Sequence, residues 1–184
     1  MQSGFGRLGP QWWGFERHGL DPDLVVLGKP MGNGYPVSAV AGRANVLDPF
    51  GADVRYFSTF AGADVGMAVA AEVLRQLRGG IVDRVEGVGR RLREEVASLS
   101  ASTPGIASVR GAGLYLGVEF RDAETSQPDP RAAVTMSNAL RRARVLASVS
   151  GAHENVLKVR PPLVFDDAHV TEFTQAYAEA LAEV

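Results

Sequence analysis

The stretch Leu24–Gly42 reads LVVLGKPMGNGYPVSAVAG and places one lysine, Lys29, between two apolar runs and inside a glycine-rich loop. The first run, residues 23–27, is short and nearly unbroken, which is typical of a strand buried on both faces. Residues 36–41 form the second run, and the glycines, proline and asparagine between the two runs predict a turn. The sequence therefore predicts two strands connected by a loop that carries Lys29 at its start.

Lys29 has two interpretations. A lysine at the end of a strand usually keeps its ammonium group in water, and this is the more frequent outcome for a lysine taken by itself. However, open α/β sheets bind ligands at the carboxyl ends of their strands, and a partly shielded neutral amine there can attack a carbonyl carbon. The chain contains 17 arginines but only two lysines, Lys29 and Lys158. Because arginine stays protonated, a lysine kept in such a sequence favours a chemical role.

Composition restricts the broad class of the protein. The chain has 184 residues, of which 46% are hydrophobic and 22% are charged, as in an ordinary soluble globular protein. A formal net charge of −2 gives no general attraction to nucleic acid or to an anionic membrane. No apolar run approaches the roughly 18 residues of a membrane span. Cysteine is absent, so we expect no disulfide, no thiolate metal site and a cytoplasmic location.

The rest of the chain predicts a mixture of helices and strands. In chain order the periodicity indicates an extended piece at 54–62, helices at 65–77 and 82–99, a strand at 114–120, a helix at 131–144, two strands within 145–165 and a last helix capped by Asp166. Gly79-Gly80 ends the first of these helices. We place a domain boundary there, which gives domains 1–79 and 80–184, the second of them an α+β unit.

One glycine motif near the N-terminus is misleading. Gly4, Gly6 and Gly9 in GFGRLG match the spacing G-x-G-x-x-G of dinucleotide-binding loops. That motif requires a strand before it and a helix that opens inside it, whereas here Pro10 follows directly. We therefore expect no dinucleotide site. GKPMGNG is not a phosphate-binding P-loop either, because the P-loop glycines precede the lysine.

Several motifs in consistent order resemble the class III (ω-type) pyridoxal-phosphate aminotransferases. They are QSGFGRLGPQWWGFERHGLDPDLVVLGKPMGNGYPVSAVAG at 2–42, YFSTFAG at 56–62, VRGAGLYLGVEF at 109–120 and VLKVRPPLVF at 156–165. The resemblance implies an α/β protein of fold type I, in which a large domain with a mainly parallel sheet precedes a small α+β domain. Residues 1–79 would be the C-terminal part of the large cofactor domain and 80–184 the small domain, within a homodimer whose sites lie at the interface.

The resemblance also implies roles for three residues. Lys29 corresponds to the lysine that forms a Schiff base with pyridoxal 5′-phosphate and then moves a proton between substrate and cofactor. Thr59 corresponds to the threonine whose hydroxyl holds the cofactor phosphate from the other subunit. Gln2 corresponds to the glutamine near the 3′ oxygen of the cofactor ring. Without the resemblance, Thr59 is more simply a strand threonine, and Gln2 carries no information.

Lys158 and Arg160 are candidates for binding the substrate. Many family members have arginine at the position of Lys158, where it clamps an α-carboxylate with two hydrogen bonds. A lysine there resembles the branch that contains phospholyases of phosphorylated amino alcohols, since a compact ammonium suits phosphate. Arg160 is two residues further on and, in a strand, points to the same face. Either residue could instead be a solvated strand charge.

Some parts of the family pattern have no counterpart in this sequence. Family members carry, upstream of the position of Gln2, an aspartate for the pyridine nitrogen, a glycine-containing phosphate loop and a ring-stacking aromatic residue. We therefore expect an N-terminally truncated chain that binds the cofactor weakly and exposes apolar faces around LVVLG and VSAVAG.

Three functions remain open. The first is transamination between an amine or amino acid and a keto acid or aldehyde. The second is elimination of phosphate and ammonia from a phosphorylated amino alcohol with the same cofactor. The third is a non-catalytic remnant or dimerising fragment. A requirement for a keto acid separates the first from the second.

Overall fold

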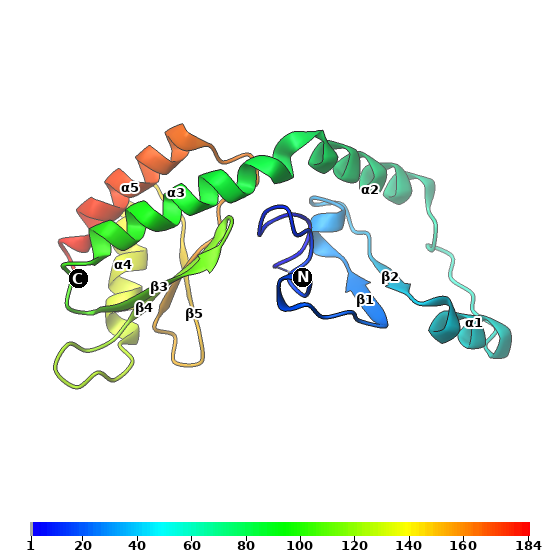
Figure 1. The fold of residues 1–184 in the computed structure, drawn as a ribbon, viewed down its shortest axis with the longest axis horizontal. Coiled ribbons are helices and arrows are strands. Elements are labelled where there is room, and N and C mark those ends of the chain that lie inside the picture. The colour runs from blue at the N-terminus through cyan, green and yellow to red at the C-terminus, as the bar shows by residue number, and fades with distance from the viewer. Residues whose placement is uncertain (1) are drawn as a thin grey trace. The chain divides into compact units, whose positions relative to one another are not determined.

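The computed structural model describes residues 2–184, which form two compact units (Figure 1). The first unit consists of residues 2–6 and Gln11–Val82, and the second unit consists of Arg7–Pro10 and Asp83–Val184. The chain therefore contributes to the second unit twice, first with a short segment and later with its C-terminal half. This arrangement makes Arg7–Pro10 part of a unit whose other residues lie far away in the sequence.

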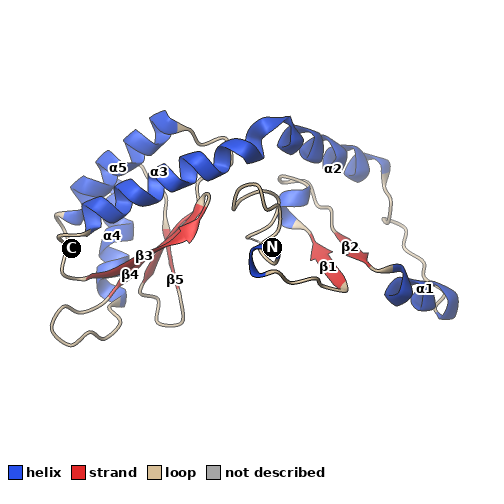
Figure 2. Ribbon diagram, viewed as in Figure 1, coloured by secondary structure: helices blue, strands red, loops and turns tan. Residues whose placement is uncertain are grey.

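The first unit contains a two-stranded antiparallel sheet and two α-helices (Figure 2). Its elements are the 3₁₀ helix η1 (Glu16–His18), strand β1 (Leu24–Leu27), the 3₁₀ helix η2 (Lys29–Met31), strand β2 (Ala39–Gly42), helix α1 (Ala44–Asp53) and helix α2 (Asp64–Gln76). Val26 of β1 lies opposite Val40 of β2. The structure thus confirms two strands connected by a loop that Lys29 begins.

Strand β1 is less buried than its apolar run predicts. Leu24 and Val26 are 46% and 69% exposed, and Val40 of the paired strand is 57% exposed. The prediction of a strand buried on both faces is therefore wrong for this chain, because a two-stranded sheet leaves its faces open unless other elements cover them. The same values confirm the expectation that apolar faces are exposed around LVVLG and VSAVAG.

The connection after β2 also differs from the prediction. The segment 54–62, predicted to be extended, contains no strand and passes through bends between α1 and α2. The sequence does not predict α1, because Pro49 and Gly51 lie inside this helix and both residue types are poor helix formers. None of its residues is buried, so the helix has no packing face that a periodic pattern would reveal.

Gly79 and Gly80 break the long helical middle of the chain, as predicted. Helix α2 is followed by a kink, η3 (Leu77–Ile81), in which Gly79 and Gly80 depart from helical backbone angles and Gly80 has φ = 98°. A residue with a Cβ is strained at that angle, whereas glycine is not. None of the helices within residues 2–184 is both long enough and apolar enough to cross a bilayer.

The second unit is a four-stranded sheet with three helices. Its elements are α3 (Val82–Ser100), β3 (Ile106–Ala112), β4 (Tyr115–Phe120), α4 (Pro130–Arg142), β5 (Ser148–Ser150), β6 (Val156–Val159) and α5 (Asp167–Leu181). The strand order is β3-β4-β6-β5. Every strand pair in residues 2–184 is antiparallel, so the described chain holds none of the parallel pairing that the resemblance implies for a large domain.

The core of the second unit lies on one face of this sheet. Along β4, Leu116, Val118 and Phe120 are at most 2% exposed, whereas the residues between them are partly exposed. The predicted stripe of α3 packs in the same core, and its most buried members are Val85, Leu92 and Val96. β6, α4 and α5 supply the other large buried side chains: Leu157, Met136, Leu140, Val170 and Tyr177. The structure confirms both the one-faced strand and the amphipathic helix.

Strands β3 and β4 form a hairpin where the sequence predicts only one strand. Its turn contains Gly113, whose φ is 51°. A Cβ on Gly113 would lie 2.5 Å from the carbonyl oxygen of Arg7, and a Cβ on Gly89 of α3 would lie 2.2 Å from the carbonyl oxygen of Gly113. Glycine is needed at both positions because helix, turn and N-terminal segment touch through their backbones.

An aspartate begins each of the last two helices. Asp129 caps α4, and Asp166 caps α5 by accepting hydrogen bonds from the backbone N–H groups of Ala168 and His169 at 3.0 and 3.2 Å. The ring of His169 accepts in return from the backbone N–H of Asp166 at 3.3 Å, which completes a capping box. The predicted cap at Asp166 is confirmed.

Because of Tyr177, we expect the second unit to become less stable as the pH rises into the alkaline range. Its buried hydroxyl lies 2.8 Å from Ser100 Oγ, which itself donates to the carbonyl oxygen of Val96 at 2.6 Å. Burial raises the pKa of Tyr177 from 10.0 to about 12. The unfolded chain therefore loses this proton first, and we expect the free energy of unfolding to fall by on the order of 1 kcal/mol between about pH 9 and about pH 11. Urea unfolding at the two pH values measures this change in the free energy of unfolding.

Tyr177→Phe is the matched control, since it keeps the ring and removes the hydroxyl that ionises. We expect the pH dependence of its unfolding free energy to be smaller than that of the wild type by the same amount. An equally steep decline in both proteins would show that another group is responsible.

Candidate functional site

Lys29 lies directly after β1 and is the first residue of η2. Its φ of 44° falls in the left-handed region that non-glycine residues rarely adopt, at a cost on the order of 1 kcal/mol. The residue is exposed, and the ion pairs found within residues 2–184 do not include it. Backbone strain of this kind clusters at functional sites, and here it falls on a residue with a nucleophilic amine.

The glycines after Lys29 serve the packing of the loop itself. Gly32 is buried, and a Cβ on it would lie 2.1 Å from the carbonyl oxygen of Tyr35 and 2.7 Å from Val37 Cγ1. Asn33 and Gly34 follow with φ of 44° and 109°, which turn the chain toward β2. Gly32 is therefore required for a tight contact within the loop.

Thr59 and Gln2 also belong to the first unit. Thr59 lies in a bend between α1 and α2 and is exposed, with Phe57 and Phe60 beside it at 83% and 86% exposed. Gln2 is partly exposed in a turn. The side-chain hydrogen bonds of the described first unit all involve other residues, so none of them joins Lys29, Thr59 or Gln2 to another.

The chemistry of these three side chains fits pyridoxal phosphate. A primary amine can bond to its aldehyde carbon, a hydroxyl can donate to its phosphate, and a carboxamide can donate to its ring oxygen. Lys29, Thr59 and Gln2 supply one group each, and each residue is at least partly exposed. These groups are therefore available to a ligand rather than committed to the protein's own structure.

Lys158 and Arg160 lie in the second unit, on and just beyond β6. Lys158 pairs across the sheet with Gly117 of β4 and Ser148 of β5, so it occupies an inner strand. Its neighbours Leu157 and Val159 are 0% and 4% exposed and face the core. Lys158 therefore lies on the opposite, open face.

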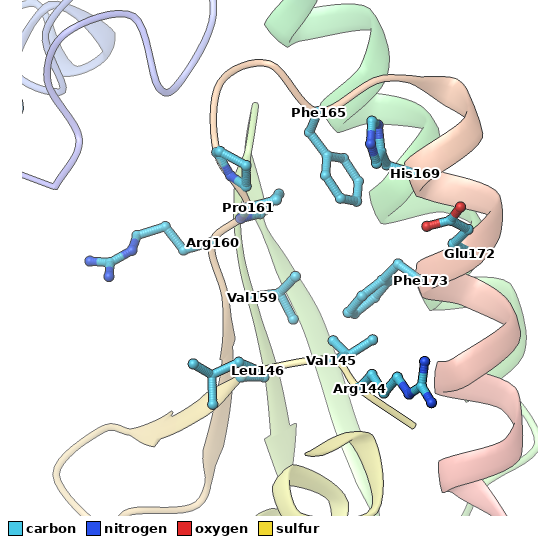
Figure 3. A pocket seen from close by; sticks show the side chains of 12 residues that line it. Arg144, Val145, Leu146, Val159, Arg160, Pro161, Phe165, His169, Glu172 and Phe173 are labelled. Atoms are coloured by element: carbon cyan, nitrogen blue, oxygen red, sulfur yellow. The ribbon is translucent and has the colours of Figure 1, made fainter. Parts of the chain in front are cut away.

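A cavity of about 240 Å³ in the second unit lies on the core side of β6 and does not include Lys158. Its inner wall is apolar and includes Val159, Phe165 and Phe173 (Figure 3). Figure 3 shows Arg160 extending away from Phe173, so its guanidinium is directed away from the apolar wall. Arg160 is thus one of the residues that line this cavity, whereas Lys158 is not.

Arg7 is a residue that the sequence analysis missed. Its Nη1 donates to the carbonyl oxygens of Leu114 and Pro161 at 3.1 and 2.7 Å, and its own carbonyl oxygen accepts from the N–H of Leu114 at 2.9 Å. Burial and the nearby Arg160 lower the pKa of the Arg7 guanidinium. The only signal in the sequence was an arginine within the glycine motif GFGRLG, which we interpreted for its glycines.

Comparisons with known proteins identify the family. The model of the class III aminotransferases matches residues 1–181. The alanine–glyoxylate aminotransferase 2-like protein of Drosophila melanogaster is 38% identical over 188 residues, which cover 100% of this chain and 38% of that protein. The ethanolamine-phosphate phospho-lyase homolog 1 of Caenorhabditis elegans is 35% identical over 186 residues, which cover 98% of this chain and 40% of that protein. The chain thus spans about 40% of the length of these curated relatives.

Solved structures agree with this assignment. A phospholyase from Arthrobacter in complex with phosphoethanolamine superposes with a TM-score of 0.96 at 36% identity, covering 100% of this chain and 44% of that one. An S-selective transaminase from Arthrobacter sp. with alanine bound superposes with a TM-score of 0.86 at 23% identity, covering 98% of this chain and 42% of that one, and this likeness concerns the fold alone. The cofactor of these enzymes is pyridoxal phosphate, and the fold is a part of fold type I. The chain belongs to the class III aminotransferase family.

Proposed function

We propose that this chain serves transamination between an amine or amino acid and a keto acid or aldehyde, with Lys29 as its catalytic residue. The observation that carries the proposal is the exposed Lys29 amine, which follows β1 at a strained backbone position. It occurs in a chain that matches the family over nearly its whole length. An amine in this setting is positioned by the backbone yet free of an ion pair within residues 2–184.

Each of three residues has a role in this proposal. Pyridoxal phosphate, when bound, supplies an aldehyde for the amino group and a ring that withdraws electrons from the substrate's α-carbon. Lys29 would hold the cofactor covalently and, as a neutral amine, would move the proton at the α-carbon. Thr59 would donate its hydroxyl hydrogen to the phosphate, and Gln2 would donate an amide hydrogen to the 3′ oxygen of the ring.

A direct assay tests this function. The chain is mixed with pyridoxal phosphate, an amino acid donor and a keto acid, and the newly formed amino acid is measured by chromatography. We expect Lys29→Ala to lower the rate by about 100-fold, because a positioned general base contributes at least that much. Equal rates for Lys29→Ala and the wild type would contradict the assignment of Lys29.

A second candidate function is the elimination of phosphate from a phosphorylated amino alcohol. The observation that favours it is Lys158, a lysine on the open face of the sheet where the family pattern has arginine. Its compact ammonium suits a phosphate group better than a planar carboxylate. Two of the similar proteins, from Caenorhabditis elegans and Arthrobacter, carry phospholyase names.

Incubation of the chain with phosphoethanolamine in the absence of a keto acid distinguishes the two functions. For the second function we expect the wild type to release inorganic phosphate. We expect Lys158→Ala to release it about tenfold more slowly, since a charged hydrogen bond to the substrate disappears. Arg131→Ala is the control, because it removes an exposed cation of the same unit that lies on α4 instead of the sheet. Amino transfer without phosphate release would reject the second function and retain the first. The absence of both activities would leave a non-catalytic fragment.

We further infer that the full-length protein is a cytoplasmic homodimer in which residues 1–79 belong to the large domain and 80–184 form the small domain. Support for a partner subunit comes from the aromatic side chains around Thr59, since Phe57 and Phe60 expose over four-fifths of their surface. Large apolar side chains exposed in such proximity are typical of interaction surfaces.

A further inference from the structure

We propose that a cavity of the first unit binds an α-amino acid with an aromatic side chain. The cavity has a volume of about 410 Å³ and lies entirely within that unit. Its walls come mainly from six apolar side chains, three of them aromatic: Phe5, Trp12, Trp13, Leu27, Met31 and Leu74. The inference goes beyond the proposed function, because Lys29 does not line the cavity and binding here needs no pyridoxal phosphate.

The first argument is the size and lining of the cavity. Sites for small organic molecules usually have volumes of roughly 300–1,000 Å³, with mostly apolar and aromatic walls and a few polar groups that orient the ligand. The cavity of the first unit, at about 410 Å³, falls within this range, whereas that of the second unit, at about 240 Å³, falls below it. The first-unit cavity therefore has room for an aromatic ring and a small polar group.

The second argument is that the aromatic side of the cavity is already ordered. The carbonyl oxygen of Trp12 accepts from the N–H of Gly6 at 3.1 Å. Trp13 is held twice, since its N–H donates to Glu16 Oε2 at 3.0 Å and its carbonyl oxygen accepts from the N–H of Glu16 at 3.1 Å. The rings of Phe5 and Trp13 are in edge-to-face contact, with centroids 4.9 Å apart. Walls that are fixed in this way lose little entropy when a ligand binds.

The third argument is the backbone of Phe5. Its φ of 55° lies in the left-handed region, which is rare for a bulky residue, and its side chain is only 3% exposed. Backbone strain of this kind persists only where the surrounding structure enforces it, and it clusters at ligand-binding sites. At Phe5 this strained backbone carries an aromatic ring that lines the cavity.

The fourth argument is that the cavity also has one charged group of each sign. Glu16 and Arg78 line it, and both residues are exposed. Within residues 2–184 neither of them belongs to an ion pair, whereas Arg75, three residues before Arg78, pairs with Glu72 at 2.7 Å. The hydrogen bonds of the described chain engage only Oε2 of Glu16, so its Oε1 can accept from a ligand.

These features together indicate the chemistry of the ligand. An α-amino acid carries an ammonium group for Glu16 and a carboxylate that the guanidinium of Arg78 can bind through two hydrogen bonds. An aromatic side chain packs favourably against tryptophan and phenylalanine rings. An aromatic amine would leave Arg78 without a partner, and an aromatic acid would leave Glu16 without one. A small amino acid such as alanine would leave the apolar walls in contact with water.

Titration of the full chain with L-phenylalanine, without pyridoxal phosphate, tests the site through tryptophan fluorescence. Trp12 and Trp13 are the only tryptophans of the chain and both line the cavity, so a bound ring should change their emission. We expect Glu16→Gln and Arg78→Gln each to weaken the binding of phenylalanine by about threefold or more, since each removes a charged contact at an exposed position. We expect L-alanine to bind at least about tenfold more weakly than phenylalanine.

Two analogues identify which charge meets which end of the ligand. Phenethylamine keeps only the ammonium group, so its affinity should fall in Glu16→Gln and not in Arg78→Gln. Phenylpropionate keeps only the carboxylate and should show the reverse. Arg75→Gln is the matched control, because Arg75 is an exposed arginine of the same unit that does not line the cavity. Glu16→Gln keeps a side-chain oxygen for the N–H of Trp13, so this variant preserves the aromatic wall.

The outcomes separate this proposal from others. A wild type whose tryptophan emission does not respond to phenylalanine would overturn it, and so would equal affinities for phenylalanine and alanine. An equal loss of affinity in Arg75→Gln and Arg78→Gln would overturn it as well, since net charge alone would then explain the binding. Lys29→Ala should leave the affinity for phenylalanine within about twofold, so failure of the Lys29 assignment and failure of this site are distinguishable.

Discussion

Lys29→Ala is expected to abolish the covalent labelling of this chain by pyridoxal phosphate and borohydride. Borohydride reduces the bond between a lysine amine and the cofactor aldehyde to a stable pyridoxyl adduct, which peptide mapping by mass spectrometry locates. We expect the wild type, at millimolar cofactor, to carry the adduct on Lys29 at least about tenfold more than on Lys158, because Lys29 combines an available amine with a backbone that fixes its direction. The composition makes the readout clean, since these are the only two lysines of the chain.

Lys158 is the internal control of the same experiment. It is partly buried on the open face of the sheet and reports how much label a lysine receives without a dedicated site. Lys29→Arg is the second control, because it keeps the positive charge and removes the nucleophile. Comparable labelling of the two lysines would contradict a specific role for Lys29, and so would an adduct yield that Lys29→Ala does not lower.

Phe120→Ala is expected to have the largest effect on stability, a loss of about 3–5 kcal/mol in the free energy of unfolding of the second unit. The Phe120 side chain is fully buried in the core at the end of β4. Its backbone also matters to the unit, since its N–H donates to the carbonyl oxygen of Asn155 at 2.8 Å and its carbonyl oxygen accepts from Asn155 Nδ2 at 2.8 Å. Alanine keeps these backbone bonds and leaves a cavity, so the loss reports on packing alone.

Native-state hydrogen exchange at the amides of β4 and β6 measures this loss in the second unit. Phe57→Ala is the matched control, because it deletes the same ring from a position that is 83% exposed and should change the value by less than about 0.5 kcal/mol. Both tryptophans, Trp12 and Trp13, belong to the first unit, so their fluorescence follows that unit in the same samples. A loss below about 1 kcal/mol for Phe120→Ala would show that the core of this unit is not packed as described.

The elements that pack one face against a core can be predicted from the periodicity of their side chains. The stripe of α3, the alternation along β4 and the cap at Asp166 all occur in the structure as predicted. These patterns are reliable because burial against a core selects apolar side chains at each turn of a helix or each second residue of a strand. Helix α1 has no such apolar pattern, since none of its residues is buried. The motifs around Lys29 and the family they imply were likewise present in the linear sequence.

The surroundings of these elements follow from the folded chain and cannot be predicted from local patterns. An apolar run such as β1 specifies a strand but not whether other elements cover it, and here Val26 remains 69% exposed. The left-handed backbone of Lys29 depends on the turn that its loop completes at Gly32 and Tyr35. Arg7 depends on contacts with residues more than 100 positions away, at Leu114 and Pro161. Contacts between residues so far apart in the sequence produce no local periodic pattern, because they form only when the folded chain brings distant segments together.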